Sequence, residues 1–480
     1  LESVSTSSLD ADARLDLALL RRHAQLSSFR LVSLREWQTR PSYYEELFAV
    51  NVYLDRDYAP LSERAARLVE HERAALLQVR HIRANLGSPL SAPVVETAIK
   101  IYRGYAEYLR GEVVKRLAAV KDRPLQQEFA RINEQLAGEA ERLATHLREV
   151  ELPRGDASHV LGPERYARLL QVQEQLPFDA LELKRRAQAD LAQNRAAYET
   201  LAKRVRPTRP RADQLLAEAA RLVERSRVFV AEKRLLTLPG KSAASVRETP
   251  PYMRYNQAFL NGPGPFETAE EAFYYITSPD PAWPKREQEE YVMTYGNLLA
   301  TSVHEVYPGH FVQGQWMRRA PTRVQKMMDS YSFVEGWAHY VEQMMVDEGF
   351  GSEDPQYRLG QLADALLRDC RVLASIGIHT EGMSVSEAAR LFETACKQDT
   401  ATAREQAVRG TFDPGYFAYT LGKLQILELR AEAEGRLGAR FELGRFHDAL
   451  LSHGAPPVPL LRERVLAELE ANPGAARHRR

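Results

Sequence analysis

Residues 287–310 read EQEEYVMTYGNLLATSVHEVYPGH, a helical pattern that ends in two histidines and a glutamate. Apolar residues recur at three- and four-residue steps, which predicts a helix running to about Tyr307. Its end, HEVYPGH, resembles the metal-binding HExxH motif, but Pro308 stands where the second histidine belongs and the next histidine is His310. The stretch therefore predicts a helical protein with a candidate metal site at a helix end.

The spacing of His304 and His310 is wrong for a straight helix. Residues six apart differ in direction by roughly 120° and lie about 9 Å apart along the axis. Pro308 lacks an amide N–H, and its ring would clash with the carbonyl of residue 304, while Gly309 tolerates unusual backbone angles. We therefore predict a bulge or kink at Pro308–Gly309 that returns His310 to the side of His304.

A second motif, EGWAHYVE at residues 335–342, carries acidic and imidazole groups on one helix face. Glu335, His339 and Glu342 follow each other at steps of four and three residues. Glu335 comes 25 residues after His310, so it can supply a third ligand from the next helix. The alternative is that these residues are an ordinary surface pair and a core histidine with satisfied hydrogen bonds.

Two histidines and a glutamate with one open position form a catalytic zinc shell. Such a shell also suits the composition, because two cysteines are too few for a cysteine-rich zinc module. We predict one Zn²⁺ per chain bound by His304, His310 and Glu335, with Glu305 as general base and with His339 and Glu342 orienting the ligands.

The composition excludes several other classes. The chain has 480 residues, with 65 Lys+Arg against 65 Asp+Glu, so no excess charge predicts a nucleic acid or acidic membrane as partner. No run approaches 18 apolar residues, which predicts no membrane span. Cys370 and Cys396 are expected to be buried free thiols, although one disulfide is possible. The start, LESVSTSSLDAD, lacks a methionine, which favours an exported protein over a cytoplasmic one.

Sequence texture predicts a mainly α fold with one short β segment. Residues 1–234 are helical in pattern, and helices resume after residue 285 and continue to 470. Between them, prolines, glycines and aromatic residues separate short β-type runs at Ser245–Glu248 and Ala272–Thr277. We expect a small antiparallel sheet beside the motif helix, and a disordered tail at residues 471–480.

HEVYPGH and EGWAHYVE together resemble a bacterial family known as domain of unknown function 885. The resemblance extends to SVRETPPYMR, SIGIHTEG, GYFAYTLGKLQILELR and FHDALLSHGAPPVPLL. That family is similar to helical zincin peptidases such as carboxypeptidase Taq, the thimet oligopeptidases and angiotensin-converting enzyme. The resemblance implies a clamshell-like zincin fold, with residues 1–234 as one wall of the cleft and residues 235–470 as the catalytic half.

The resemblance also suggests further site residues. His379 and Tyr419 match the histidine and tyrosine that stabilise the oxyanion in helical zincins, with Tyr416 as a competitor for the tyrosine role. Tyr274, on a strand that could pair with an extended peptide, Tyr416 and Arg430 are candidate substrate-binding residues. The alternatives are packed aromatic rings for the tyrosines and a structural ion pair for Arg430.

These features predict a zinc-dependent peptidase that acts on short peptides. Two other functions fit the same residues: an amidase acting on non-peptide amides, and a non-catalytic metal- or peptide-binding protein. Glu305 speaks against the last, because a structural zinc site needs no carboxylate beside its ligand. The sequence leaves substrate preference and oligomeric state open.

Overall fold

A computed structural model describes residues 4–240, 242–250, 253–254, 256–267 and 271–471. The described chain is mainly α, as predicted, and divides into two compact units that are discontinuous in sequence. The larger unit comprises Leu1–Ser27, Gly162–Thr249 and Asn256–Arg480, and the smaller comprises Ser28–Leu161 and Pro250–Tyr255. The predicted tail lies almost entirely outside the described residues, and the predicted cleft walls stay a prediction.

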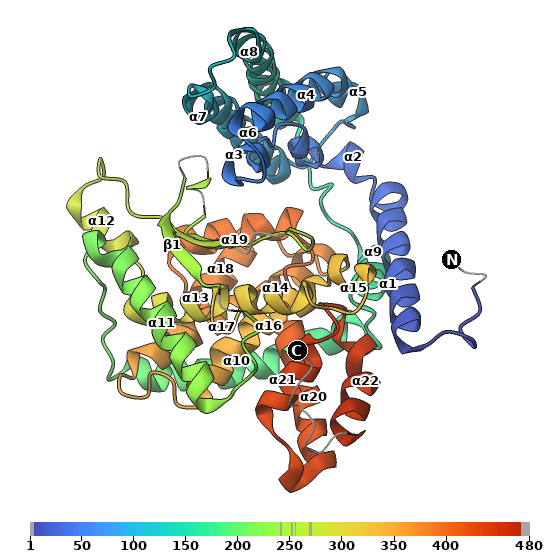
Figure 1. The fold of residues 1–480 in the computed structure, drawn as a ribbon, viewed down its shortest axis with the longest axis vertical. Helices are drawn as coiled ribbons and strands as arrows, with labels where there is room; N and C mark the ends of the chain where they lie inside the picture. Colours follow the sequence, from blue (N-terminus) through green and yellow to red (C-terminus); the bar gives the residue numbers. More distant parts are fainter. Residues whose placement is uncertain (1–3, 241, 251–252, 255, 268–270, 472–480) are drawn as a thin grey trace. The chain divides into compact units, whose positions relative to one another are not determined.

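The smaller unit is a group of amphipathic helices around its own apolar core. The longest of its three long helices packs on both of the others (Figure 1), and buried side chains such as Leu68, Tyr102 and Leu136 lie in this core. Asp122 begins the last of them by accepting a hydrogen bond from the amide of Leu125. The helices are α2 (Glu36–Thr39), α3 (Val52–Asp55), α4 (Leu61–Val79), α5 (Ile82–Asn85), α6 (Ala92–Tyr108), α7 (Val114–Leu117) and α8 (Arg123–His146).

The larger unit carries the sheet and the remaining helices (Figure 1). Its helices before the sheet are α1 (Ala11–Ser28), α9 (Pro163–Glu174), α10 (Ala180–Ala202) and α11 (Leu215–Lys233). Those after the sheet are α12 (Lys285–Tyr291), α13 (Tyr295–Glu305), α14 (His310–Met317), α15 (Arg323–Met327), α16 (Tyr331–Asp347), α17 (Gln356–Thr380), α18 (Val385–Thr394), α19 (Thr400–Phe412), α20 (Ala418–Leu437), α21 (Leu443–Leu451) and α22 (Val458–Ala471).

The sheet has strands β1 (Ala244–Glu248), β2 (Ala258–Asn261) and β3 (Ala272–Ile276), in the order β1-β3-β2. β2 pairs with β3 antiparallel, but β1 pairs with β3 in parallel, so the expectation of an antiparallel sheet is wrong. Strands β1 and β3 were predicted from the sequence, but β2 was not. Because β2 lies between them along the chain, the chain can return and pair β3 with β1 in parallel. The sheet does lie beside the motif helix, because β2 packs on α13.

The predicted long motif helix is divided in two. Helix α12 ends at Tyr291, and α13 begins at Tyr295 with Thr294 as its N-cap. The Thr294 side chain accepts a hydrogen bond from the amide of Asn297, which satisfies an amide that a new helix start leaves unpaired. Apolar periodicity continues across this break, which is why periodicity alone did not reveal it.

Glycines let the helices around the motif pack unusually close. A methyl carbon built on Gly422 of α20 would lie 1.7 Å from the Ser332 carbonyl oxygen of α16. The α13–α17 contact has the same character, because Gly296 and Gly360 face each other there. These two contacts fix α16 on α20 and α13 on α17, and so position the two motifs.

Cys370 and Cys396 form a disulfide, which corrects the expectation of free thiols. Helix α18 folds back on α17 and brings the two Cα atoms to 6.3 Å, within the range of disulfides. Within the part of the chain that the structure describes, no helix is long and apolar enough to cross a membrane.

Candidate metal centre

The PG turn reverses the chain between the two histidines. Helix α13 ends at Glu305, α14 begins at His310, and the Tyr307–Pro308 peptide bond is cis. The Gly309 amide donates to the Val303 carbonyl at 3.0 Å, and Trp337 Nε1 donates to the Pro308 carbonyl at 2.9 Å. The structure thus contains the predicted interruption, as a turn between two helices.

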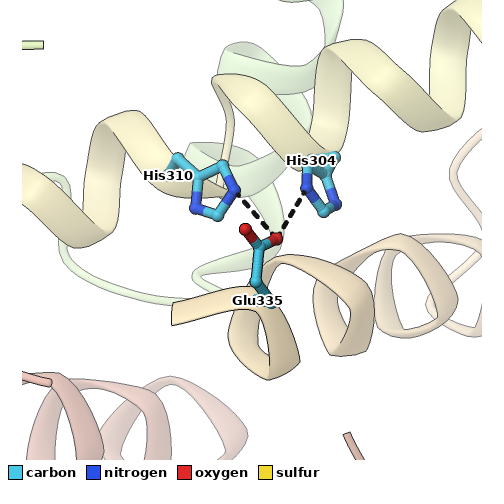
Figure 2. A group of neighbouring side chains, drawn as sticks. All are labelled: His304, His310 and Glu335. Carbon is cyan, nitrogen blue, oxygen red and sulfur yellow. Dashed lines mark ion pairs between the residues drawn. The ribbon is translucent and has the colours of Figure 1, made fainter. Parts of the chain in front are cut away.

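Three side chains from three helices meet at this turn (Figure 2). Glu335 Oε2 lies 3.4 Å from His304 Nε2 and 3.5 Å from His310 Nε2, and the three atoms are all within 4.8 Å of one another. Ligands about 2.0–2.1 Å from a tetrahedral ion are about 3.4 Å apart. The two measured separations match this value, so the donor set fits a zinc ion.

The buried carboxylate supports that fit independently. Glu335 Oε2 is buried and makes no hydrogen bond to any described residue, although it faces two imidazoles. A buried charged oxygen without a hydrogen bond is costly unless a counter-charge satisfies it. A cation held by His304, His310 and Glu335 would supply that charge.

Hydrogen bonds turn both Nε2 atoms toward Glu335. His304 Nδ1 donates to Glu342 Oε1 at 2.6 Å, and His310 Nδ1 donates to Gln313 Oε1 at 3.5 Å. Such bonds at Nδ1 leave Nε2 free as the ligand atom. Glu342 thus makes the contact with His304 that its predicted orienting role requires, and that role stays a prediction. Gln313, which belongs to neither motif, makes the corresponding contact with His310.

Glu342 is the centre of a buried charge cluster. Arg368 donates to Glu342 Oε2 at 2.6 Å, and His339 Nδ1 donates to the same oxygen at 3.4 Å. Burial raises the pKa of Glu342, but Arg368, His304 and His339 outweigh burial and hold it well below the usual range. Burial and the charges of Lys423 and Arg368 lower the pKa of His339 to about 3, so His339 is neutral at pH 7.

His304 and Glu335 each stabilise the charged form of the other. Burial lowers the pKa of His304, but its contacts with the carboxylates of Glu335 and Glu342 outweigh burial and raise the pKa to about 9. Burial raises the pKa of Glu335, but the two ligand histidines hold it well below its usual range. Because a metal ion needs neutral imidazole, it would compete here with a proton.

Glu305 follows His304 at the end of α13 and is partly exposed. Its carboxylate lies close enough to Tyr274 to contribute to the raised pKa of that phenol, after burial. Glu305 is therefore beside a ligand and reaches solvent, which a general base requires. Its role in catalysis stays a prediction.

Tyr419 reaches the cluster from α20. Its ring stacks on that of His304, with centroids 6.4 Å apart and an interplanar angle of 16°. Burial, followed by the charge of Glu335, raises the pKa of Tyr419 despite nearby arginines, so the phenol keeps its proton at pH 7. Tyr331, which no motif revealed, packs edge-on against Tyr419 at 6.0 Å.

His379 and Tyr416 are fully buried and make no described contact with His304, His310 or Glu335. His379 is fully buried, its Nε2 donates to the Gly410 carbonyl at 2.8 Å, and its ring stacks on Tyr166. It follows Arg368 by eleven residues on α17, about 16 Å along the axis. Tyr416 is fully buried against Gly410. These positions correct the predicted oxyanion role of His379 and the predicted substrate role of Tyr416.

Two further substrate candidates are structural. Tyr274 is fully buried on β3, the middle strand, so β3 cannot add a peptide strand; its hydroxyl lies 3.5 Å from that of Ser302. Arg430 donates to Glu434 at 2.8 Å and to the hydroxyl of Tyr340 at 3.3 Å. Both placements correct the predicted substrate contacts, and Arg430 forms the ion pair that was its alternative.

The buried arginines of α17 belong to no motif in the sequence. Arg368 and Arg371 lie in a largely apolar helical run, LADALLRDCRVLASIGIH, that also contains Asp364 and Asp369, and both arginines are buried. Charged residues in such a run are costly to bury without partners. This was the available signal, but it does not say which partners they have.

Comparison with known proteins places the chain in a family. The solved structures that are similar to this one include two at 22% and 19% sequence identity. The first, a "putative lipoprotein of unknown function" from Shewanella oneidensis, has a TM-score of 0.80 over 97% of this chain and 89% of that chain. The second, a "putative lipoprotein" from Colwellia psychrerythraea, has a TM-score of 0.67 over 85% of this chain and 74% of that chain.

At these identities the two structures share the fold with this chain. No curated protein matches. The model of the family described as "Bacterial protein of unknown function (DUF885)" matches residues 1–465. The chain therefore belongs to the DUF885 family of bacterial proteins.

Proposed function

We propose that the chain is a zinc-dependent peptidase of the helical zincin type, acting on short peptides. One observation carries the proposal: His304, His310 and Glu335 present three ligand atoms at separations that suit a tetrahedral ion. Three protein ligands leave a fourth position open, as catalytic zinc sites do. A bound zinc ion would polarise the scissile carbonyl and lower the pKa of a water molecule toward about 7.

The residues around the cluster have roles that follow from their contacts. Glu305 takes the proton of the attacking water and delivers it to the leaving amine. Tyr419, protonated and stacked on His304, is the candidate donor to the developing oxyanion. Glu342 and Arg368 hold the His304 ring in position from the opposite side.

Access from solvent is also present. The side chain of Glu335 is 18% exposed and that of His310 is 17% exposed, whereas Glu342 behind them is fully buried. The cluster thus has one side open to solvent and one side closed by supporting charges. A purely structural metal site has no need of the open side.

Metal analysis tests the site. We expect about one zinc per chain in the purified wild-type protein, and loss of that zinc in His304→Ala. His81→Ala, at an exposed histidine of the smaller unit, is the matched control and keeps the metal. Stoichiometric zinc in His304→Ala would remove the proposed site.

A peptide-library digest read by mass spectrometry tests the reaction. Wild type should cleave peptides, while Glu305→Gln keeps the zinc and loses turnover by at least about 100-fold. Cleavage of non-peptide amides alone would make the protein an amidase. Full activity of the glutamine variant would contradict the role of Glu305.

We also propose that the protein is exported. Two structural neighbours are each described as a "putative lipoprotein", and disulfides such as Cys370–Cys396 persist in oxidising compartments. Thiol titration of the denatured, unreduced protein from its native host should find no free thiol. Two free thiols would oppose export.

A further inference from the structure

Three arginines surround the ring of Tyr419, next to the candidate metal centre. The Cζ atoms of Arg371, Arg368 and Arg409 lie 4.6, 5.6 and 6.0 Å from the centroid of that ring. They come from two helices, α17 and α19, so folding brings together positive charges that are separate in sequence. We call these three residues the arginine group.

Two of the three guanidinium groups have carboxylate partners. Arg368 pairs with Glu342 at 2.6 Å, and Arg409 pairs with Asp413 at 2.9 Å. Arg371 donates from Nε to the neutral amide oxygen of Gln406 at 2.9 Å. Among the residues that the structure describes, no carboxylate forms an ion pair with Arg371.

Burying the charge of Arg371 without an acidic partner costs free energy. Arg371 is only 7% exposed, and burial, followed by the charge of Arg409, lowers its pKa from the ordinary value. The face of Tyr419 compensates only in part, since a cation–π contact offsets a fraction of the lost hydration. An arginine kept charged without a counter-ion suggests an anion that arrives from outside.

The arginine group lies within a short peptide's reach of the metal ligands. Tyr419 is shared by both: its ring is 6.4 Å from that of His304 and 4.6 Å from Arg371 Cζ. These two distances place Arg371 Cζ no more than about 11 Å from the His304 ring. One extended residue spans about 3.3–3.6 Å, so one or two residues fill the gap once ion contacts at each end are allowed for.

The arginine group is partly exposed at Arg409. Arg409 is 28% exposed and Asp413 is 23% exposed, and Tyr331 is partly exposed between them and Glu335. Tyr331 accepts a hydrogen bond from Arg409 and donates one to Asp413, so its ring is held in place beside the arginines. Arg409, Asp413 and Tyr331 are thus the part of this surrounding that solvent reaches.

We propose that Arg371, supported by Arg409, binds the terminal carboxylate of a peptide substrate, so that the protein removes one or two residues from the carboxyl end. The proposal rests on the proposed peptidase function and specifies its substrate. Hydrolysis breaks the amide C–N bond with one water: the acyl carbon takes the hydroxyl group, and the amine nitrogen of the released fragment takes the remaining proton. Bidentate arginine–carboxylate geometry would fix which peptide bond reaches the metal ligands.

Binding to an inactive variant tests the proposal without turnover. The probes are N-acetyl-tetraalanine with a free carboxylate and the same peptide as its terminal amide, titrated calorimetrically into zinc-loaded Glu305→Gln. The free acid should bind roughly 10- to 100-fold more tightly than the amide. Adding Arg371→Met should abolish this preference, and adding Arg371→Lys should retain only part of it.

Controls separate this proposal from the peptidase proposal. Arg358→Met, on the same helix but in a surface ion pair with Asp347, should preserve the preference. Arg371→Met removes an unpaired charge, so it should fold with unchanged circular dichroism and at least wild-type thermal stability. If Arg371→Met does not fold, the preference of Arg371→Lys for the free acid over the amide tests the proposal instead.

The outcomes are distinct. Equal binding of acid and amide, or a preference that survives Arg371→Met, overturns the carboxylate subsite even if wild type cleaves peptides. Internal cleavage of amidated peptides at the rate of free acids overturns it too. A protein that cleaves no peptide but still shows the Arg371-dependent preference would refute the peptidase proposal and leave the anion subsite in place.

Discussion

Gly309 offers the most direct test of the turn between the two histidines. A methyl carbon built there would lie 1.7 Å from the His304 carbonyl oxygen and 2.4 Å from that of Val303. Real Cβ atoms essentially never approach closer than 3.0 Å, so Gly309→Ala must move backbone by more than 1 Å. The atoms that must move belong to His304, which is one metal ligand, and to Gly309, which directly precedes His310, the other histidine ligand.

The expected loss follows from this displacement. Overpacking of this kind costs about 1–3 kcal/mol of stability, and a ligand set must be held within about 0.5 Å to keep its geometry. We therefore expect Gly309→Ala to lower the free energy of unfolding by about 1–3 kcal/mol and to weaken zinc binding at least tenfold. Chelator competition and urea denaturation measure the two effects.

Gly314 is the matched control, five residues further along α14. A methyl carbon there meets nothing within 4 Å, and alanine favours a helix interior over glycine by about 0.5–1 kcal/mol. Gly314→Ala should therefore be neutral or slightly stabilising and should bind zinc like wild type. Wild-type zinc affinity and stability in Gly309→Ala would refute the reasoning that this close approach positions His310.

Three further predictions concern supporting residues. Glu342→Gln should weaken zinc binding about 10- to 100-fold in chelator competition, because His304 and Arg368 lose their carboxylate; an unchanged affinity would contradict that role. Glu72→Gln should stabilise the protein at pH 8 but hardly at pH 5. Burial without hydrogen bonds raises the pKa of Glu72 to about 8, so the folded state loses stability as the pH rises above about 4.5, by at most about 5 kcal/mol. Equal gains in stability at both pH values in urea denaturation would exclude this cause. Cys370→Ser should lower the free energy of unfolding by about 2–4 kcal/mol under oxidising conditions and leave it level with reduced wild type, and a loss that persists against reduced wild type would point to packing instead.

Local chemistry could be predicted from the sequence, because it depends on neighbours in the chain. Pro308 and Gly309 indicated an interrupted helix, and the helical spacing of Glu335 and Glu342 indicated one ligand-bearing face. Both motifs lie on segments whose conformation their own residues largely determine. The ligand set could thus be proposed before any distance was known.

The remaining parts depend on tertiary packing, which sequence periodicity does not report. β3 was expected to accept a peptide strand, but the unpredicted β2 covers one of its sides and β1 the other. The expectation for His379 came from the family resemblance, yet helix rise alone carries it about 16 Å past Arg368. Strand order and helix register are set by long-range contacts, and no local pattern encodes them.

Two neighbouring arginines on α17, Arg368 and Arg371, differ in whether they have an acidic partner. Glu342 accepts a hydrogen bond from His304 with one oxygen and from Arg368 with the other. The charge of Arg368 is therefore already neutralised by the carboxylate that orients His304. Arg371, one turn further along the same helix, has no such carboxylate. If both arginines served only to stabilise the fold, the second would be expected to have its own acidic partner, as Arg409 has Asp413. The difference between two neighbouring arginines on α17 is therefore better explained by a substrate group than by packing.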